Sequence, residues 1–288
     1  MAQEQATGAL TSAELSFLPK LGIGFAALLL LYAGLSSSTL MGPGIGASSG
    51  GIFGPDATLL APATLAFSIW TVIYLGLFGC AVLVWFPDSR SNERRRTGVW
   101  PAAMSMLLNM LWITAAMRGI VWATIPLVLA VLASVIMLLE RVRGRRAAGP
   151  AAAIIVEGTF GLYLGWLLVA SAANVMAVVR HGGSNPAGAA SQALAVILLL
   201  VVIAAAVAAS IRYPRVWGIP IAVCWALIWI IRQRTHGALS SPLIAGLAFA
   251  GAVAVTLAFV WPLMRGSAPQ VRAADGAASL ANVPRTGR

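Results

Sequence analysis

Three apolar stretches of the sequence carry tryptophan, tyrosine and asparagine side chains at helical spacing. These residues are Trp70, Tyr74, Asn109, Trp112, Tyr163, Trp166 and Asn174. At 100° per residue, the members of each stretch lie within about 80° of one another on a helix. An asparagine in apolar surroundings costs free energy unless its amide is hydrogen-bonded. Tryptophan and tyrosine each offer a flat face and one polar group. Three such stripes predict a pocket for a large, flat, mostly apolar ligand.

A second interpretation gives the same residues a structural role. Tryptophan, tyrosine and asparagine also pack and hydrogen-bond between membrane helices, and aromatic residues gather at membrane surfaces. The sequence leaves both interpretations open, and they differ in whether the three stripes meet at one cavity.

Few other residues could carry chemistry. Glu157 is an acidic residue within an apolar stretch, where ionisable residues are functional by default. It faces away from the tyrosine and tryptophan of its own stretch on a helical wheel. It could reach water, stay protonated or pair with an arginine of the preceding loop. His181 and His236 could form a haem ligand pair or be solvated loop residues.

The sequence contains no metalloprotease, hydrolase or nucleotide-binding motif. We therefore expect a binding protein and not an enzyme, with no metal or cofactor required. Gly161 and Gly165 form a G-x-x-x-G motif, which permits close helix approach either within one chain or between the protomers of a homodimer.

The composition places all of these residues in a membrane. Hydrophobic residues make up 60% of the 288 residues and charged residues only 9%, against about a quarter charged in soluble domains. The formal charge of +11 comes largely from arginine runs between apolar stretches. A nucleic-acid partner would need a basic stripe on a folded domain, so we expect no nucleic acid. Anionic membrane lipids are the expected partners of these runs.

About 20 apolar residues cross a bilayer as a helix, and eight stretches meet this need. They cover about 21–40, 63–86, 100–117, 120–139, 152–179, 192–211, 216–231 and 242–264. The predicted fold class is therefore all-α, a polytopic bundle of eight transmembrane helices. A glycine-rich loop, 41–62, follows the first stretch, and a basic loop, 87–96, follows the second.

The distribution of basic residues predicts the orientation. With the N-terminus inside, 15 of the 19 Lys and Arg residues fall on inner segments, as the positive-inside rule requires. Both termini are then cytoplasmic, in a bacterial-type plasma (inner) membrane.

The spacings resemble those of the translocator protein / tryptophan-rich sensory protein (TspO/MBR) family. That family has a proline eight residues before W-T-x-x-Y, then L-N-x-x-W, then Y-x-x-W with an asparagine eight residues after the tryptophan. The corresponding motifs begin at Pro62, Leu108 and Tyr163. The paired proline and aromatic residue that usually precede the second helix are absent here, and three further spans follow the usual five.

The resemblance implies a five-helix bundle that binds a porphyrin, another tetrapyrrole, haem or a sterol-like molecule. The seven residues named first would line or support the cavity, and the loop 41–62 would be its lid. The chain would divide into a cytoplasmic segment 1–20, the bundle 21–180, three additional helices 181–264 and a disordered cytoplasmic tail 265–288. A small-molecule transporter, a tetrapyrrole-degrading enzyme and a structural partner without a ligand are the alternatives.

Overall fold

The computed structural model describes residues 17–36, 44–86, 92–144 and 150–265, and within these ranges the chain is helical, without a strand. The long helices are α2 (Phe17–Ser36), α4 (Ile69–Leu83), α5 (Asn92–Met117), α6 (Thr124–Val142), α7 (Pro150–His181), α8 (Ala189–Arg212), α9 (Gly218–His236) and α10 (Pro242–Arg265). Short helical turns are α3 (Gly44–Ala47), η1 (Ser49–Gly51), η2 (Thr64–Ser68) and η4 (Val121–Ala123).

Each of the eight predicted spans coincides with one long helix, so the all-α prediction is confirmed. Among the described residues, seven helices are long and apolar enough to cross a membrane. The other long helix, α9, carries Arg232, Gln233 and Arg234 in its last two turns, and these residues lower its mean hydropathy. It packs against both α7 and α10.

The basic loop after the second predicted span is shorter than predicted. Residues from Asn92 onward form the first turns of α5, so the prediction of a loop over 87–96 is wrong for its second half. Arginine and glutamate are good helix formers, and Arg94 is fixed by an ion pair with Glu157 at 3.0 Å. Of the predicted terminal segments 1–20 and 265–288, residues 1–16 and 266–288 lie outside the described residues, as does the start of the predicted lid at 41–43. Residues 17–20 belong to α2 and Arg265 ends α10.

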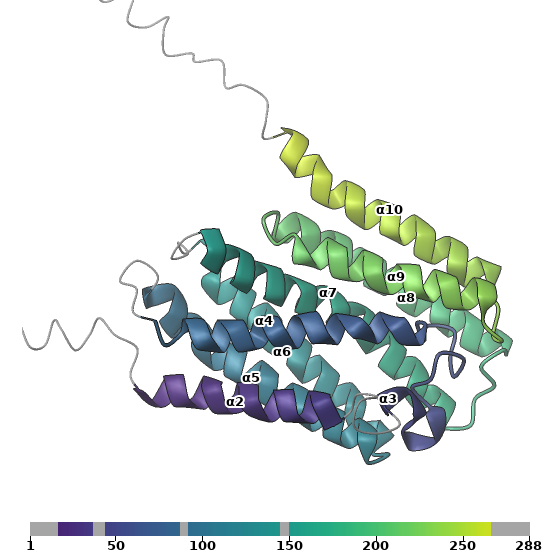
Figure 1. The fold of residues 1–288 in the computed structure, drawn as a ribbon. Helices are drawn as coiled ribbons and strands as arrows, with labels where there is room; N and C mark the ends of the chain where they lie inside the picture. The colour runs from purple at the N-terminus through teal and green to yellow at the C-terminus, as the bar shows by residue number, and fades with distance from the viewer. Residues whose placement is uncertain (1–16, 37–43, 87–91, 145–149, 266–288) are drawn as a thin grey trace, which may run out of the picture.

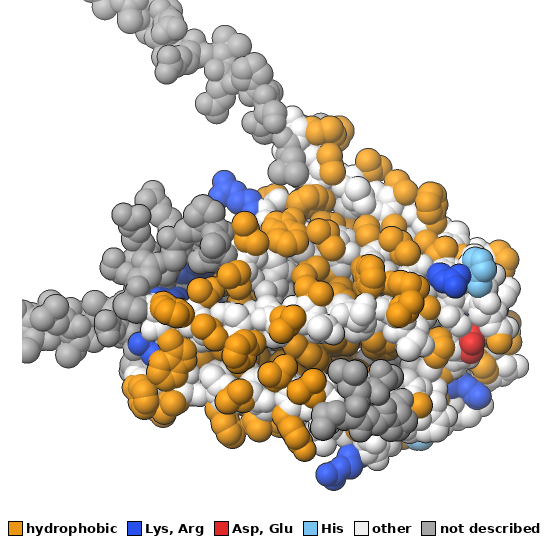
Figure 2. All heavy atoms as spheres, viewed as in Figure 1, with side chains coloured by type: hydrophobic (Ala, Val, Ile, Leu, Met, Phe, Trp, Pro, Cys, Tyr) orange, Lys and Arg blue, Asp and Glu red, His pale blue; other side chains and the backbone are white. Residues whose placement is uncertain are grey.

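Large apolar side chains are exposed on the outer faces of the helices. They include Phe25, Leu75, Val201 and Leu257, each at least 59% exposed, and Figure 2 shows hydrophobic side chains over most of one flank of the molecule. Soluble proteins rarely expose so extensive an apolar surface to water. Lipid solvates such a surface, and the helices form their backbone hydrogen bonds internally. The chain is a multi-pass membrane protein.

Helix α7 is the centre of the bundle, because α4, α6, α8 and α9 all pack against it (Figure 1). Small residues let α9 approach closely. A Cβ atom on Gly161 would lie 3.0 Å from Gly218 Cα, and one on Gly165 would lie 2.5 Å from Ile219 O. The G-x-x-x-G motif is therefore used within one chain, to join the first five long helices to the three that follow.

Candidate ligand-binding site

The three predicted stripes converge on one small cavity between α4, α5 and α7. Its volume is about 50 Å³. Five aromatic rings contribute to its wall and one asparagine supplies an amide. The lining residues are Ile45, Ile52, Phe53, Thr58, Ala61, Pro62, Phe67, Trp70, Trp112, Trp166, Val169, Ala170, Ala173, Asn174 and Ala177.

Four of the seven predicted site residues line the cavity itself. Trp70 comes from α4, Trp112 from α5, and Trp166 and Asn174 from α7. The rings of Trp70 and Trp166 meet edge to face with centroids 6.0 Å apart, and Phe67 meets Trp166 in the same way at 5.8 Å. Edge-to-face contacts hold aromatic rings in defined orientations, so the wall is preformed.

Asn174 is held in place by two hydrogen bonds. Its Oδ1 accepts from Trp112 Nε1 at 3.0 Å, and its Nδ2 donates to Ala170 O at 2.8 Å, one turn earlier in the same helix. Both side chains are buried. The pairing satisfies two polar groups that hydrocarbon would otherwise leave without partners, and it fixes α5 against α7 at the cavity.

The other three predicted residues lie behind this wall. Tyr74 stacks on Trp70 with centroids 5.1 Å apart, and the Tyr163 ring meets Trp70 edge to face at 5.9 Å. Tyr163 also donates its hydroxyl to Ser105 O at 3.3 Å. These rings support Trp70 and do not line the cavity themselves.

Asn109 is the polar centre of that supporting layer. It is 1% exposed and lies close to the hydroxyl groups of Tyr74 and Tyr163. Its Nδ2 group has no hydrogen-bond partner among the described residues. A buried amide donor without a partner is unusual, and here it marks a polar point just behind the aromatic wall.

The segment 44–62 covers the cavity and supplies six of its lining residues. Ser48 Oγ donates to Met117 Sδ at 3.1 Å, and Ser49 Oγ donates to Ala116 O, so the last turn of α5 holds one end of the segment. Ser49, Gly50 and Gly51 have φ values of 54°, 69° and 76°. This left-handed backbone suits glycine and turns the chain back over the bundle.

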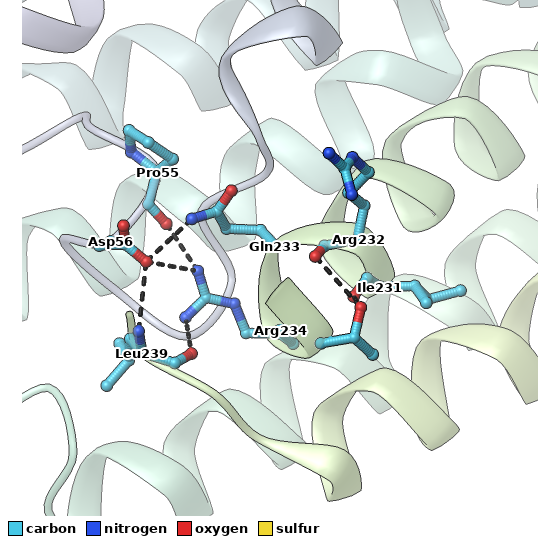
Figure 3. Close-up of polar contacts among 8 residues, drawn as sticks. Pro55, Asp56, Ile231, Arg232, Gln233, Arg234 and Leu239 are labelled. Carbon is cyan, nitrogen blue, oxygen red and sulfur yellow. Dashed lines mark hydrogen bonds and ion pairs between the residues drawn. The ribbon is translucent and has the colours of Figure 1, made fainter. Parts of the chain in front are cut away.

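Arg234, near the end of α9, holds the middle of the covering segment at Pro55 and Asp56 (Figure 3). Its side chain is fully buried. One terminal nitrogen donates to Pro55 O at 2.6 Å and the other to Leu239 O at 2.6 Å. Asp56 lies 3.8 Å from the guanidinium and accepts hydrogen bonds from Gln233 Nε2 and from the Leu239 amide. We call these contacts of Arg234 with Pro55, Asp56 and Leu239 the latch. Sequence reasoning missed the latch and counted Arg234 only among the basic residues of the outer segments.

The charge on Asp56 makes the latch sensitive to acid. Burial acts to raise the pKa of Asp56, but the hydrogen bonds from Gln233 and the Leu239 amide, together with the charge of Arg234, lower it below its ordinary 3.8. A carboxylate with a lowered folded-state pKa contributes stability that is complete above the unfolded pKa. That stability is lost as the pH falls through the folded pKa.

We therefore expect amide hydrogen exchange of residues 56–61, corrected for the intrinsic rate, to be constant from neutral pH down to about pH 5 and to rise below about pH 4. Asp56→Asn, which keeps an oxygen acceptor, should abolish the acid-induced step. A rise that begins near pH 6, or one that persists in the asparagine variant, would assign the step to another group.

The remaining candidates lie elsewhere. Glu157 pairs with Arg94 of α5, while Arg145 and Arg146 of the loop that precedes α7 lie outside the described residues. The His181 ring lies 6.1 Å from that of Trp122, while His236 contacts Thr235. The two histidines thus contact different neighbours, and in the described part of the chain no three His, Cys, Asp or Glu residues are grouped as metal ligands would be.

Comparison with protein families gives a match over most of the chain. A family model described as TSPO-like protein matches residues 23–261. The match begins within α2, includes α4 to α9 and ends within α10. No curated protein and no solved structure matches the chain significantly.

Proposed function

Because the chain belongs to the TSPO-like protein family, we propose that it binds a flat hydrophobic ligand in the aromatic cavity beneath the segment 44–62. The observation that supports this proposal is the convergence of Trp70, Trp112, Trp166 and Asn174, from three helices, on one cavity. The wall offers flat apolar faces, which give affinity, and one amide, which gives orientation. Protoporphyrin is the first ligand to test, and a sterol-like molecule is the second.

The size of the cavity determines how such a ligand enters. Pockets for drug-sized ligands occupy roughly 300–1,000 Å³, far more than the 50 Å³ found here. The first part of the segment 44–62, as far as Asp56, is held by side-chain contacts of Ser48, Ser49 and Arg234, whereas Leu59 and Leu60 near its end are buried in the core. Entry of a porphyrin therefore requires this segment to move, as lids do in many binding proteins.

The proposal is tested by titrating the purified protein with protoporphyrin and following the porphyrin absorbance. Trp166 is 3% exposed and lines the cavity, whereas Trp100 is 54% exposed and faces outward. We expect Trp166→Ala to weaken saturable binding by about tenfold or more, because loss of an aromatic ring that stacks on a flat ligand costs about 1–3 kcal/mol. Trp100→Ala should bind as the unsubstituted protein does. Equal affinity of both variants would place the porphyrin elsewhere.

Binding alone accounts for the groups in the cavity wall, which provide shape, stacking faces and hydrogen bonds. We propose no covalent step and no required cofactor. The arginine-rich end of the bundle, with Arg94, Arg143 and Arg215, would face the cytoplasm of a bacterial-type plasma membrane by the positive-inside rule. The covered cavity would then open toward the outer side. Transport and tetrapyrrole degradation remain the alternatives to this binding role.

A further inference from the structure

A second and larger recess lies at the opposite, arginine-rich end of the bundle. Its volume is about 670 Å³. Helices α5, α6, α7 and α8 and the turn that follows α8 all contribute to it. The lining residues are Arg94, Leu139, Val142, Arg143, Gly144, Ala153, Glu157, Arg212, Tyr213, Pro214, Arg215 and Val216. Tyr213 is the one aromatic residue among them, so the recess is chemically unlike the aromatic cavity.

Positive charge exceeds negative charge around this recess. Four arginines line it, against one carboxylate, that of Glu157. A second carboxylate, that of Glu140, is shared by Arg212 at 2.8 Å and Arg143 at 3.4 Å, and it also accepts the Tyr213 hydroxyl hydrogen bond at 2.7 Å. Counting both acids, two positive charges are uncompensated among the described residues.

Two of the arginines, Arg94 and Arg215, have N–H donors that are available to a ligand. Arg94 has a side chain only 8% exposed, and although its terminal nitrogen pairs with Glu157, its buried Nε has no hydrogen-bond partner in the described ranges. Arg215 is exposed at the rim of the recess. Within the described residues it forms no ion pair, unlike its neighbour Arg212. A recess with apolar walls, a buried guanidinium and an excess of positive charge suits an anion.

We propose that this recess binds a phosphate-type oxyanion, either as the headgroup of an anionic lipid or as a free ion. Guanidinium groups match the oxygens of a phosphate with paired N–H donors. Basic recesses between transmembrane helices are places where anionic headgroups bind. Leu139, Val142 and Val216 supply apolar surface beside the arginines, where the first carbons of a lipid chain can pack. The site is separate from the aromatic cavity, and its occupancy does not depend on the ligand proposed there.

The test uses the full-length protein in a neutral detergent and measures thermal stability during titration with three probes. The probes are dioctanoyl phosphatidic acid, inorganic phosphate and, as a neutral control, dioctanoyl phosphatidylcholine. We expect saturable stabilisation by the phosphatidic acid and none by the phosphatidylcholine. Stabilisation by inorganic phosphate as well would identify a site for the free ion, whereas a response to the lipid alone would identify a headgroup site.

The variants localise the effect. Arg215→Gln should weaken the binding of the stabilising probe by about tenfold, the usual consequence of losing a charge-assisted hydrogen bond. Arg232→Gln removes the same charge from an exposed position in α9 at the other end of the bundle and should leave binding unchanged. Both arginines are exposed, so neither change threatens folding. The proposal is overturned if neither anionic probe stabilises the protein, or if the two variants weaken binding equally.

Discussion

Arg234→Ala should release the part of the segment 44–62 around Pro55 and destabilise the protein by roughly 3 kcal/mol, because two hydrogen bonds from a charged group are lost. The Pro55 and Leu239 carbonyl groups that now receive those bonds at 2.6 Å would lose their partner. Asp56 would keep its bonds from Gln233 and Leu239 but would lose the compensating charge. The freed segment should also admit ligand faster, so the association rate of protoporphyrin should rise while thermal stability falls.

Arg232→Ala is the matched control. Arg232 lies on the same helix and carries the same charge, but it is exposed and points away from Asp56 (Figure 3). Surface substitutions of this kind usually change stability by less than about 0.5 kcal/mol. Thermal unfolding and stopped-flow porphyrin binding of the two variants therefore separate the latch from a general effect of charge. Equal stability and equal association rates in both variants would show that Arg234 does not hold the segment.

Gly165→Ala should separate α7 from α9 and cost about 1–3 kcal/mol, the usual penalty for overpacking. The added Cβ would lie 2.5 Å from Ile219 O and 2.9 Å from Ala222 Cβ. The nearest obstacle is a backbone atom, so no change of side-chain rotamer relieves the contact and one helix must shift. Since α9 also carries Arg234, the shift should loosen the segment 44–62 as well.

Gly246→Ala supplies the comparison for this substitution. Gly246 is an exposed residue of α10, and a Cβ there would meet nothing within 4 Å. Alanine is favoured over glycine in a helix by up to about 1 kcal/mol, so this variant should be at least as stable as the unsubstituted protein. Thermal unfolding of the purified variants measures the difference. If Gly165→Ala is as stable as Gly246→Ala, the two helices are not packed as closely as the structure shows.

The sequence predicted the features that depend on local periodicity. Apolar length located all eight long helices, and a rotation of 100° per residue placed Trp70 with Tyr74 and Tyr163 with Trp166 on common faces. The structure places both pairs at the cavity or directly behind it. It also separates roles that spacing alone cannot separate, because Trp70 lines the cavity while Tyr74 only supports it.

The features that sequence reasoning missed depend on residues far apart in the chain. Asp56 and Arg234 meet only because α9 packs against α7 beside the covering segment. Likewise, Glu157 pairs with Arg94 because α5 begins earlier than hydropathy suggested. One local signal was available for the latch. An arginine in the last turn of an apolar helix requires a partner, and Asp56 is an acidic residue in the loop at that same end of the bundle.

The most direct test of the binding proposal is a structure of the protein in lipid nanodiscs with protoporphyrin bound. We expect the porphyrin between Trp70, Trp112 and Trp166, with the segment 44–62 displaced and the cavity enlarged well beyond its present 50 Å³. A porphyrin seated on the outer surface of the bundle, with the aromatic cavity still closed, would contradict the account.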